Sequence, residues 1–263
     1  TFSTQSNWEA TMRGLLSAIY STCAYLFFFG TFVYAIGFVE GVLAPKDIDD
    51  GHIMPLGAAL AMNSVLLAIF AVQHSVMARP AFKRMWTKIV PKSIERSTYV
   101  VAASSALALL MWQWRPAPQL VWSVQDEIAA GVIYGLSWCG FALVLASTFL
   151  ISHFHLFGLS QGFARLLNIP ESTQSHFVTP LFYKWVRHPL YLGFIIAFWA
   201  APDMSAGRLF FAIATTGYIF IGIFLEERDL VGEFGHRYYS YRKNVGMLVP
   251  KLHAARKAKR KLV

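Results

Sequence analysis

Six stretches of the chain are almost entirely apolar, and short polar or charged segments separate them. They cover residues 14–43, 56–78, 98–114, 128–151, 190–201 and 209–225. A helix needs about 20 apolar residues to cross a bilayer, and four of the stretches are long enough without further argument. The fifth is short, and only "PDMSAGR" separates it from the sixth, which predicts a tight helical hairpin. The pattern predicts an all-α, polytopic membrane helical bundle of six transmembrane helices, with five as the alternative.

The segment after the sixth stretch has a different pattern. Its apolar residues recur at helical spacing, with charged residues at the positions between them. These apolar residues are Leu230, Phe234, Tyr238, Tyr241 and Val245. We therefore expect a cytoplasmic, amphipathic C-terminal helix that closes over the ends of the bundle, with Glu226 and Glu227 at its start.

Composition supports a membrane protein and excludes several other classes. Hydrophobic residues make up 56% of the 263 residues and charged residues only 14%, which does not suit a soluble surface. The first apolar stretch is too long for a signal peptide, so we expect a retained helix. Cys23 and Cys139 both fall in predicted membrane helices, where a disulfide framework or a thiolate metal site is not expected. The sequence has no Walker loop and no dinucleotide-binding glycine motif.

The distribution of basic residues predicts the orientation. Twenty of the 23 Lys and Arg residues lie near the N-terminus, in alternate loops or after the last apolar stretch, and the other three lie in the remaining loops beside Asp and Glu. Short loops rich in Lys and Arg stay cytoplasmic, so both termini are predicted to be cytoplasmic in a bacterial-type inner membrane. The basic tail at 251–263 fits anionic lipid headgroups, and nucleic acid is not expected as a partner. No obligate protein partner is evident.

Reactive side chains gather on the predicted cytoplasmic side. His74 lies in "QHSVMARP" with Arg79, and His153 and His155 lie in "SHFHLFGLSQ". Interhelical hydrogen bonding is an equally good reading of each histidine. A spacing of two does not place His153 and His155 on one helix face, so no metal pair is expected. A haem held by His74 and His153 is an alternative.

Two further stretches carry specific motifs. "RHPLYLG" begins at Arg187, and "EERDLVGEFGHRYYSYRKNVGMLVP" begins at Glu226. Together they resemble the C-terminal half of the isoprenylcysteine carboxyl methyltransferase-like superfamily, with the pattern RHPxYxG and then EExxLxxxFGxxYxxYxxxV. Upstream stretches such as "QHSVMARPAFKRMWTKIVP", "ERSTYV" and "HFHLFGLSQ" resemble the narrower methanethiol S-methyltransferase family. The resemblance covers roughly residues 70–250.

The resemblance implies a single integral membrane methyltransferase domain over residues 1–263, with a cofactor-binding part at about 176–250. It implies an S-adenosylmethionine-dependent thiol S-methyltransferase of the EC 2.1.1 class that converts methanethiol to dimethyl sulfide, with hydrogen sulfide as a poorer acceptor. His74, His153, His155 and Arg79 are the expected catalytic residues. The expected cofactor-binding residues are His176, Val178, Tyr183, Arg187, His188, Pro189, Tyr191, Gly193, Glu226, Glu227, Tyr238 and Tyr241.

The chemistry of these residues agrees with that cofactor, which needs a cationic clamp, an acidic partner and aromatic walls. Arg187 and His188 suit the carboxylate, and Glu226 and Glu227 suit the ribose hydroxyls or the ammonium. Membrane-interface positions for the same side chains are the competing interpretation.

One departure from the superfamily pattern concerns the substrate. The carboxyl methyltransferases have an HxLVT segment and a Gly two residues before the Tyr that precedes RHP, whereas "SHFVTPLFY" shifts the His and places Leu181 at the Gly position. This disfavours a prenylated-protein substrate. A carboxyl or lipid methyltransferase of the isoprenylcysteine type stays an alternative function.

Overall fold

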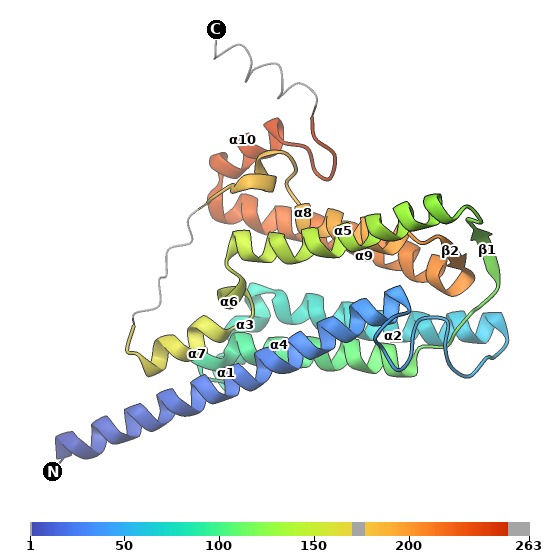
Figure 1. Cartoon of the computed structure of the whole chain (residues 1–263). Helices are drawn as coiled ribbons and strands as arrows, with labels where there is room; N and C mark the ends of the chain where they lie inside the picture. Colours follow the sequence, from blue (N-terminus) through green and yellow to red (C-terminus); the bar gives the residue numbers. More distant parts are fainter. Residues whose placement is uncertain (1, 170–176, 252–263) are drawn as a thin grey trace, which may run out of the picture. The chain divides into compact units, whose positions relative to one another are not determined.

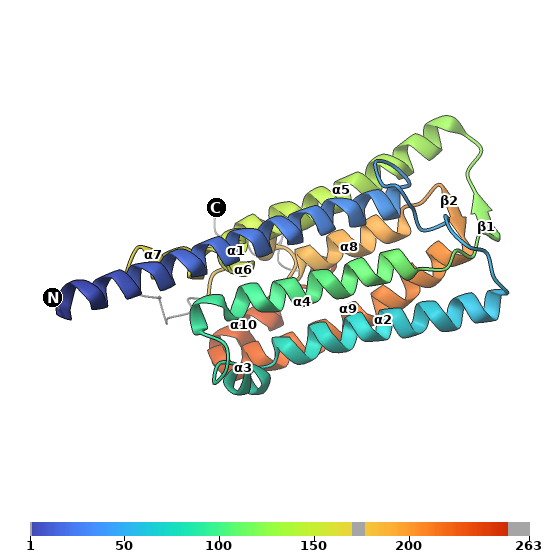
Figure 2. The ribbon, with the colours of Figure 1, turned by 90° about the horizontal axis from the view of Figure 1, so that it is seen from below.

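The computed structural model describes residues 2–169 and 177–251, and most of them are helical. The helices are α1 (Phe2–Glu40), α2 (Leu56–Ala78), α3 (Pro80–Trp86), α4 (Lys92–Gln113), α5 (Glu127–Ile151), α6 (His153–Leu156), α7 (Leu159–Leu166), the 3₁₀ helix η1 (Leu181–Lys184), α8 (Pro189–Trp199), α9 (Ala206–Phe234) and α10 (His236–Asn244). Strands β1 (Leu120–Ser123) and β2 (Asp203–Ser205) form a two-stranded sheet. Figures 1 and 2 show these elements from two directions.

Four helices are long and apolar enough to cross a membrane. Within the described residues these are the Trp8–Glu40 part of α1, together with α2, α5 and α9. Large apolar side chains on them are exposed, including Leu26, Val65, Val132 and Ile221. Such side chains suit lipid, and the protein is an integral membrane protein. Each of the six predicted apolar stretches coincides with a helix, but α8 is shorter and α4 begins with two polar turns.

The chain divides into two compact units. The N-terminal unit comprises Thr1–Gln119, Ser152–Thr173 and Ser205–Arg208, and the C-terminal unit comprises Leu120–Ile151, Gln174–Met204 and Leu209–Val263. The expectation of a single domain stays a prediction, because the chain crosses several times from one unit to the other.

In the N-terminal unit, α4 packs against α1 and α2, and α7 packs against α1. Buried serine hydroxyls join these helices: Ser97 donates to Ser21 (2.8 Å), and the hydroxyls of Ser17 and Ser93 lie 3.1 Å apart. Gly158 has a φ of +86°, and a Cβ at this position would lie 2.7 Å from the backbone nitrogen of Ser97. Small residues and hydroxyl pairs are how apolar helices approach closely in a membrane.

In the C-terminal unit, α5 and α8 pack most closely at two glycines. A Cβ on Gly193 would lie 2.6 Å from the carbonyl oxygen of Gly140, and a Cβ on Gly140 would lie equally close to that of Gly193. Ser137 adds a hydrogen bond from its hydroxyl to the carbonyl of Ala197 (2.8 Å). Gly193, which was expected to bind the cofactor, therefore makes its close approach to a neighbouring helix.

The predicted C-terminal amphipathic helix is wrong in its bounds. Glu226 and Glu227 continue α9, which ends at Phe234, and a separate α10 begins at His236. Gly235 divides the two helices with a φ of +55° and a ψ of −126°, a backbone conformation that favours glycine. The sequence did not reveal this break, because the apolar spacing continues regularly across Gly235. Phe234 before the glycine and Tyr238 and Tyr241 after it all pack against the ring of Phe177.

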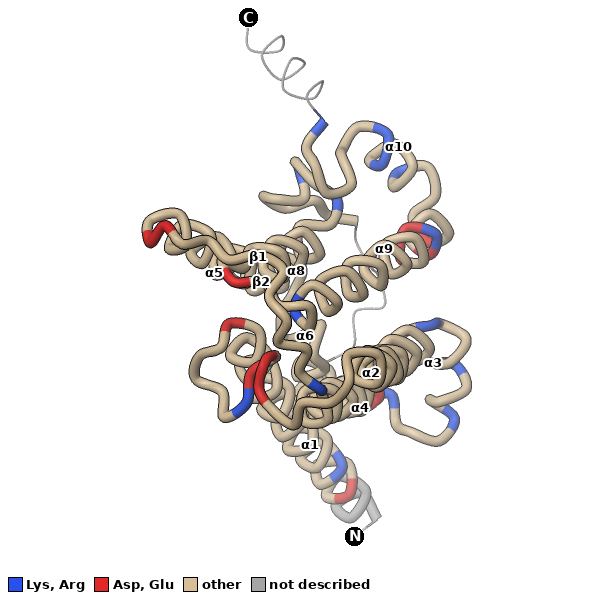
Figure 3. The backbone as a smooth tube through the Cα atoms, turned by 90° about the vertical axis from the view of Figure 1, so that its right-hand side faces the viewer, with Lys and Arg blue, Asp and Glu red and all other residues tan. Residues whose placement is uncertain are grey.

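Charges are unevenly distributed within each unit (Figure 3). In the N-terminal unit, Lys and Arg gather on and after α3, which follows the C-terminal end of α2. Asp47, Asp49 and Asp50 precede the N-terminal end of α2. In the C-terminal unit, α10 is basic, and Asp126 and Glu127 lie at the start of α5.

Candidate active site

The buried carboxylate of Glu227 is the centre of the polar cluster in the C-terminal unit. Its Oε1 accepts a hydrogen bond from Nε of Arg187 (2.7 Å) and lies 3.1 Å from Nε2 of His188. All three residues are less than a tenth exposed. Nδ1 of His188 also lies 3.8 Å from a carboxylate oxygen of Glu226, which is far more exposed. The RHP motif and the EE motif, which both supply expected cofactor-binding residues, thus meet in space.

The backbone around the RHP motif explains how Arg187 and His188 reach this position. Val186 forms a parallel bridge with Gly246, and the amides of Arg187 and His188 donate to the carbonyls of Gly246 (2.8 Å) and Met247 (3.2 Å). Pro189 then occupies the first turn of α8, where its missing N–H costs no helical hydrogen bond. The motif is therefore fixed by the segment that follows α10.

The guanidinium of Arg187 is largely occupied by the protein itself. Besides Glu227, it donates from Nη1 to the carbonyls of Arg242 (3.0 Å) and Val245 (2.6 Å). These contacts attach the end of α10 to α9. Arg187 thus has few donors left for a ligand.

Three tyrosines surround the cluster. The hydroxyl of Tyr241 donates to the carbonyl of Tyr183, and the ring of Phe177 packs against those of Tyr238 and Tyr241. Burial raises the pKa of Tyr183 and Tyr238 above the ordinary value and that of Tyr241 to about 12, so these phenols stay protonated at neutral pH. Tyr238 is 2% exposed, and its hydroxyl has no hydrogen-bond partner among the described residues. A buried phenol of this kind usually has a partner, and a bound ligand can supply one.

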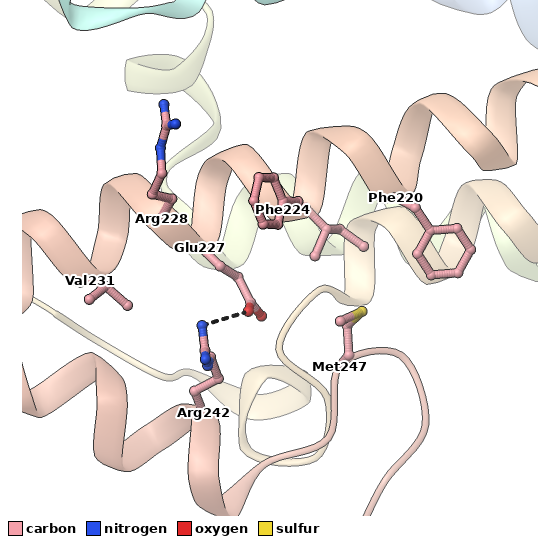
Figure 4. Close-up of a pocket in the computed structure, with 8 residues that line it drawn as sticks. Phe220, Phe224, Glu227, Arg228, Val231, Arg242 and Met247 are labelled. Carbon is pink, nitrogen blue, oxygen red and sulfur yellow. Dashed lines mark ion pairs between the residues drawn. The ribbon is translucent and has the colours of Figure 1, made fainter.

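A pocket of about 310 Å³ opens beside Glu227 (Figure 4). Glu227 and Arg242 form an ion pair on its wall, and Met247 lies nearby, whereas the guanidinium of Arg228 is turned away from them. The rest of the lining is apolar and comes from α9: Phe220, Ile223, Phe224 and Val231.

His74 lies in the N-terminal unit near the end of α2, beside Tyr99 of α4. The hydroxyl of Tyr99 lies 3.1 Å from Nδ1 and 3.0 Å from Nε2 of His74. The guanidinium of Arg96 lies 5.6 Å from the centre of the Tyr99 ring and donates from Nε to the carbonyl of Leu156 (2.8 Å). Arg96 therefore ties the surroundings of His74 to the end of α6. Interhelical hydrogen bonding, the competing interpretation of His74, has a concrete partner in Tyr99.

His153 and His155 lie on the same short helix but in different surroundings. His153 is buried, and its Nε2 lies 2.9 Å from the hydroxyl of Tyr25, with the Phe157 ring 4.9 Å away. Burial lowers the pKa of His153 below its ordinary value, so the ring is neutral at neutral pH. His155 is exposed.

The other predicted site residues are scattered. Arg79 lies between α2 and α3 and donates from Nε to the carbonyl of Ser75 (3.2 Å). Val178 is 63% exposed, the ring of Tyr191 lies 5.6 Å from that of His188, and His176 lies outside the described residues.

Comparison with known proteins places this arrangement in a family. The family model for "NnrU protein" matches residues 64–213. Methanethiol S-methyltransferase 1 of Bradyrhizobium diazoefficiens is 54% identical over 235 residues, which is 89% of this chain and 82% of the relative. The methanethiol S-methyltransferase of Mycobacterium tuberculosis is 50% identical over 242 residues, or 92% of this chain and 99% of the relative. The chain belongs to the methanethiol S-methyltransferase family.

A more distant relative is nurim of Rattus norvegicus, 30% identical over 184 residues, which is 66% of this chain and 68% of nurim. No solved structure matches the chain. The resemblance to methanethiol S-methyltransferases read from the motifs is thereby confirmed, and this member of the family is a methyltransferase.

Sequence reasoning missed several side chains that the structure of this methanethiol S-methyltransferase family member brings to the candidate residues. Arg242 directly follows Tyr241, but nothing in the sequence distinguishes it from Arg237 on the same helix. Tyr99 occurs in "ERSTYV", which carried part of the resemblance and was a usable signal. Tyr25 had no signal, because it is one aromatic residue in a long apolar stretch.

Proposed function

We propose that this protein transfers a methyl group from S-adenosylmethionine to methanethiol and so forms dimethyl sulfide, with hydrogen sulfide as a poorer acceptor. The observation that carries the proposal is about 50% identity over nearly the whole length of relatives named for methanethiol methylation. The donor is proposed from the C-terminal motifs.

The residues present fit this donor. It is a zwitterionic amino acid joined to a nucleoside through a positively charged sulfur, which supplies the methyl group when bound. The pocket is lined by the carboxylate of Glu227, the guanidinium of Arg242 and the rings of Phe220 and Phe224. The buried Tyr238 hydroxyl is not part of this lining, and it has no hydrogen-bond partner in the described part of the chain. We propose that His188, Glu226, Glu227 and the tyrosines orient the donor, and that Arg187 supports them. Val178 and His176 stay proposals on the resemblance alone.

The acceptor needs help to ionise, because a small alkyl thiol is mostly protonated at neutral pH. We propose that a histidine of the N-terminal unit accepts the thiol proton, with His74 and His153 ahead of the exposed His155. Burial keeps the His153 ring neutral, so that a ring nitrogen can accept a proton, and the same burial lowers the basicity of that nitrogen. That thiolate sulfur would be the nucleophile for the methyl group that the bound donor supplies, with the sulfur of the donor as the leaving group. Arg79 is the proposed stabilising charge.

We propose that six helices span a bacterial-type inner membrane, with both termini, the active site and α10 on the cytoplasmic side. In each unit the basic end described above is the end proposed to be cytoplasmic, in line with the positive-inside rule. A reporter fused after residue 263 and another near Lys88 should both report the cytoplasm. A periplasmic signal from either would contradict this arrangement.

Headspace gas chromatography tests the proposed activity most directly. Purified protein given S-adenosylmethionine and methanethiol should release dimethyl sulfide, and omission of either compound should abolish the signal. Farnesylcysteine supplied in parallel should be a poor acceptor. Methylation of farnesylcysteine with none of methanethiol would favour the carboxyl methyltransferase alternative, and an intense visible band from bound haem would favour the haem alternative.

A further inference from the structure

The two oxygens of the Glu227 carboxylate have different surroundings. Oε1 is held by Arg187 at 2.7 Å and lies 3.1 Å from His188. Oε2 lies 3.6 Å from Nη1 of Arg242, too far for a hydrogen bond. Figure 4 shows this second contact on the wall of the pocket. Oε1 is therefore held in place by the protein, whereas Oε2 can exchange its contact with Arg242 for a contact with a ligand.

The guanidinium groups of Arg187 and Arg242 also differ in how firmly the protein holds them. Arg187 is buried and donates to one carboxylate and two backbone carbonyls. The Arg242 side chain is 45% exposed and lines the pocket, and within the described residues its ion pair with Glu227 is the side-chain contact observed. A partly exposed ion pair at this distance contributes little to stability, so a ligand can replace it at small cost. Of the two, Arg242 is the cation that can bind a ligand carboxylate.

We infer that Glu227 and Arg242 together recognise the amino-acid end of S-adenosylmethionine, an assignment that rests on the proposed function. The amino-acid end of this donor carries an ammonium and a carboxylate on one carbon. This pair of charges is complementary to the carboxylate of Glu227 and the guanidinium of Arg242, which lie side by side on one wall of the pocket. The ammonium binds Oε2 of Glu227, and the carboxylate binds the guanidinium of Arg242, whose paired N–H donors match two carboxylate oxygens. Arg187 is then a positioning residue, and the carboxylate-binding role expected for it belongs to Arg242.

The surroundings of the pair favour this use. Phe220, Phe224 and Met247 make the rest of the wall apolar, which strengthens charge recognition relative to open water. Arg228 also lines the pocket, but its guanidinium points away from Glu227, and its Nε lies 4.0 Å from the carboxylate of Asp229. Arg242 is thus the guanidinium on this wall that faces the carboxylate.

Calorimetry with two ligands tests the assignment. S-adenosylmethionine carries the carboxylate, and decarboxylated S-adenosylmethionine lacks it but keeps the amine. Arg242→Gln should weaken binding of the first about tenfold or more, as expected for loss of a charge-assisted contact, and should leave binding of the second unchanged or slightly tighter. The matched control is Arg237→Gln, which removes the same charge from an exposed position on the same helix and should change neither affinity.

A second variant guards against simple misfolding. Arg242→Lys keeps the charge but loses the paired donors, so it should weaken S-adenosylmethionine by a smaller factor and spare the decarboxylated ligand. Provided that the wild type binds S-adenosylmethionine, the assignment would be overturned if the Arg242 variants lost affinity equally for both ligands, or lost affinity for neither. Failure of the wild type to bind S-adenosylmethionine would instead overturn the proposed function.

Discussion

Replacing Arg187 with Met removes a guanidinium that donates to three acceptors of the C-terminal unit. These are Oε1 of Glu227 and the carbonyls of Arg242 and Val245, at 2.7, 3.0 and 2.6 Å. The side chains of Arg187 and Glu227 are only 7% and 9% exposed, so water cannot readily take the place of the lost donors. Met fills a similar volume, so the loss of charge and hydrogen bonds dominates.

The size of the effect follows from burial. Removing one partner of a buried ion pair costs about 3 to 5 kcal/mol, because the other charge is left uncompensated. For a chain of this size, that corresponds to a fall of roughly 6 to 20 °C in the unfolding temperature. Arg242→Met removes an ion pair at 3.6 Å whose guanidinium is half exposed, and it should cost less than about 1 kcal/mol.

Thermal unfolding of detergent-purified variants, followed by intrinsic fluorescence, measures this difference. Arg187→Met should unfold well below the wild type, Arg242→Met close to it, and Arg187→Lys in between, because one ammonium cannot serve all three acceptors. The double variant Arg187→Met with Glu227→Gln should recover part of the loss by removing the stranded charge. Equal unfolding temperatures for Arg187→Met and Arg242→Met would refute the structural role of Arg187.

Three further outcomes are expected from other parts of the structure. Tyr99→Phe removes the hydroxyl beside His74 and should lower the rate of dimethyl sulfide formation while leaving donor affinity near wild type; equal rates across pH would exclude this pair from the reaction. Burial lowers the folded-state pKa of His153, so the stability that this residue contributes is present above the ordinary histidine pKa of about 6.5 and is lost as the pH falls. Between pH 7.5 and 5.5, the unfolding temperature of His153→Gln should therefore decline less than that of the wild type. Gly193→Val should force α5 and α8 apart and reduce the amount of folded protein obtained, because even a Cβ would lie 2.6 Å from the carbonyl oxygen of Gly140. A wild-type amount of folded protein would show that the two helices can move apart at this position.

The fold could be predicted from the sequence where hydropathy alone determines it. The second apolar stretch, 56–78, coincides with α2, because both ends of this helix are bounded by proline or a break in the pattern. The stretch at 209–225 fell short of α9, which runs from Ala206 to Phe234. Backbone hydrogen bonding continues beyond the apolar segment, and hydropathy does not record where a helix continues into polar surroundings.

The candidate site was predictable as a set of motifs but not as a set of contacts. The RHP and EE motifs indicated that Arg187, His188 and Glu227 belong together, and the structure confirms their proximity. Which cation faces the pocket depends on how α10 turns after Gly235, and that follows from tertiary packing. The sequence alone therefore favoured Arg187 as the ligand-binding cation, although the protein uses most of its donors internally.

The dependence of the RHP motif on the segment after α10 also has a consequence for biosynthesis. Arg187 emerges from the ribosome 40 residues before its partner Glu227, and the carbonyls of Val245 and Gly246 follow almost 20 residues later still. At roughly 5 to 20 residues per second, the motif waits several seconds without these acceptors while α8, α9 and α10 are synthesised. During that interval none of these acceptors is present beside the Arg187 charge, and in the topology proposed above this charge is one of the basic residues that hold the loop in the cytoplasm. Under that proposal, one side chain contributes first to the insertion of the nascent chain and afterwards to the structure of the folded protein.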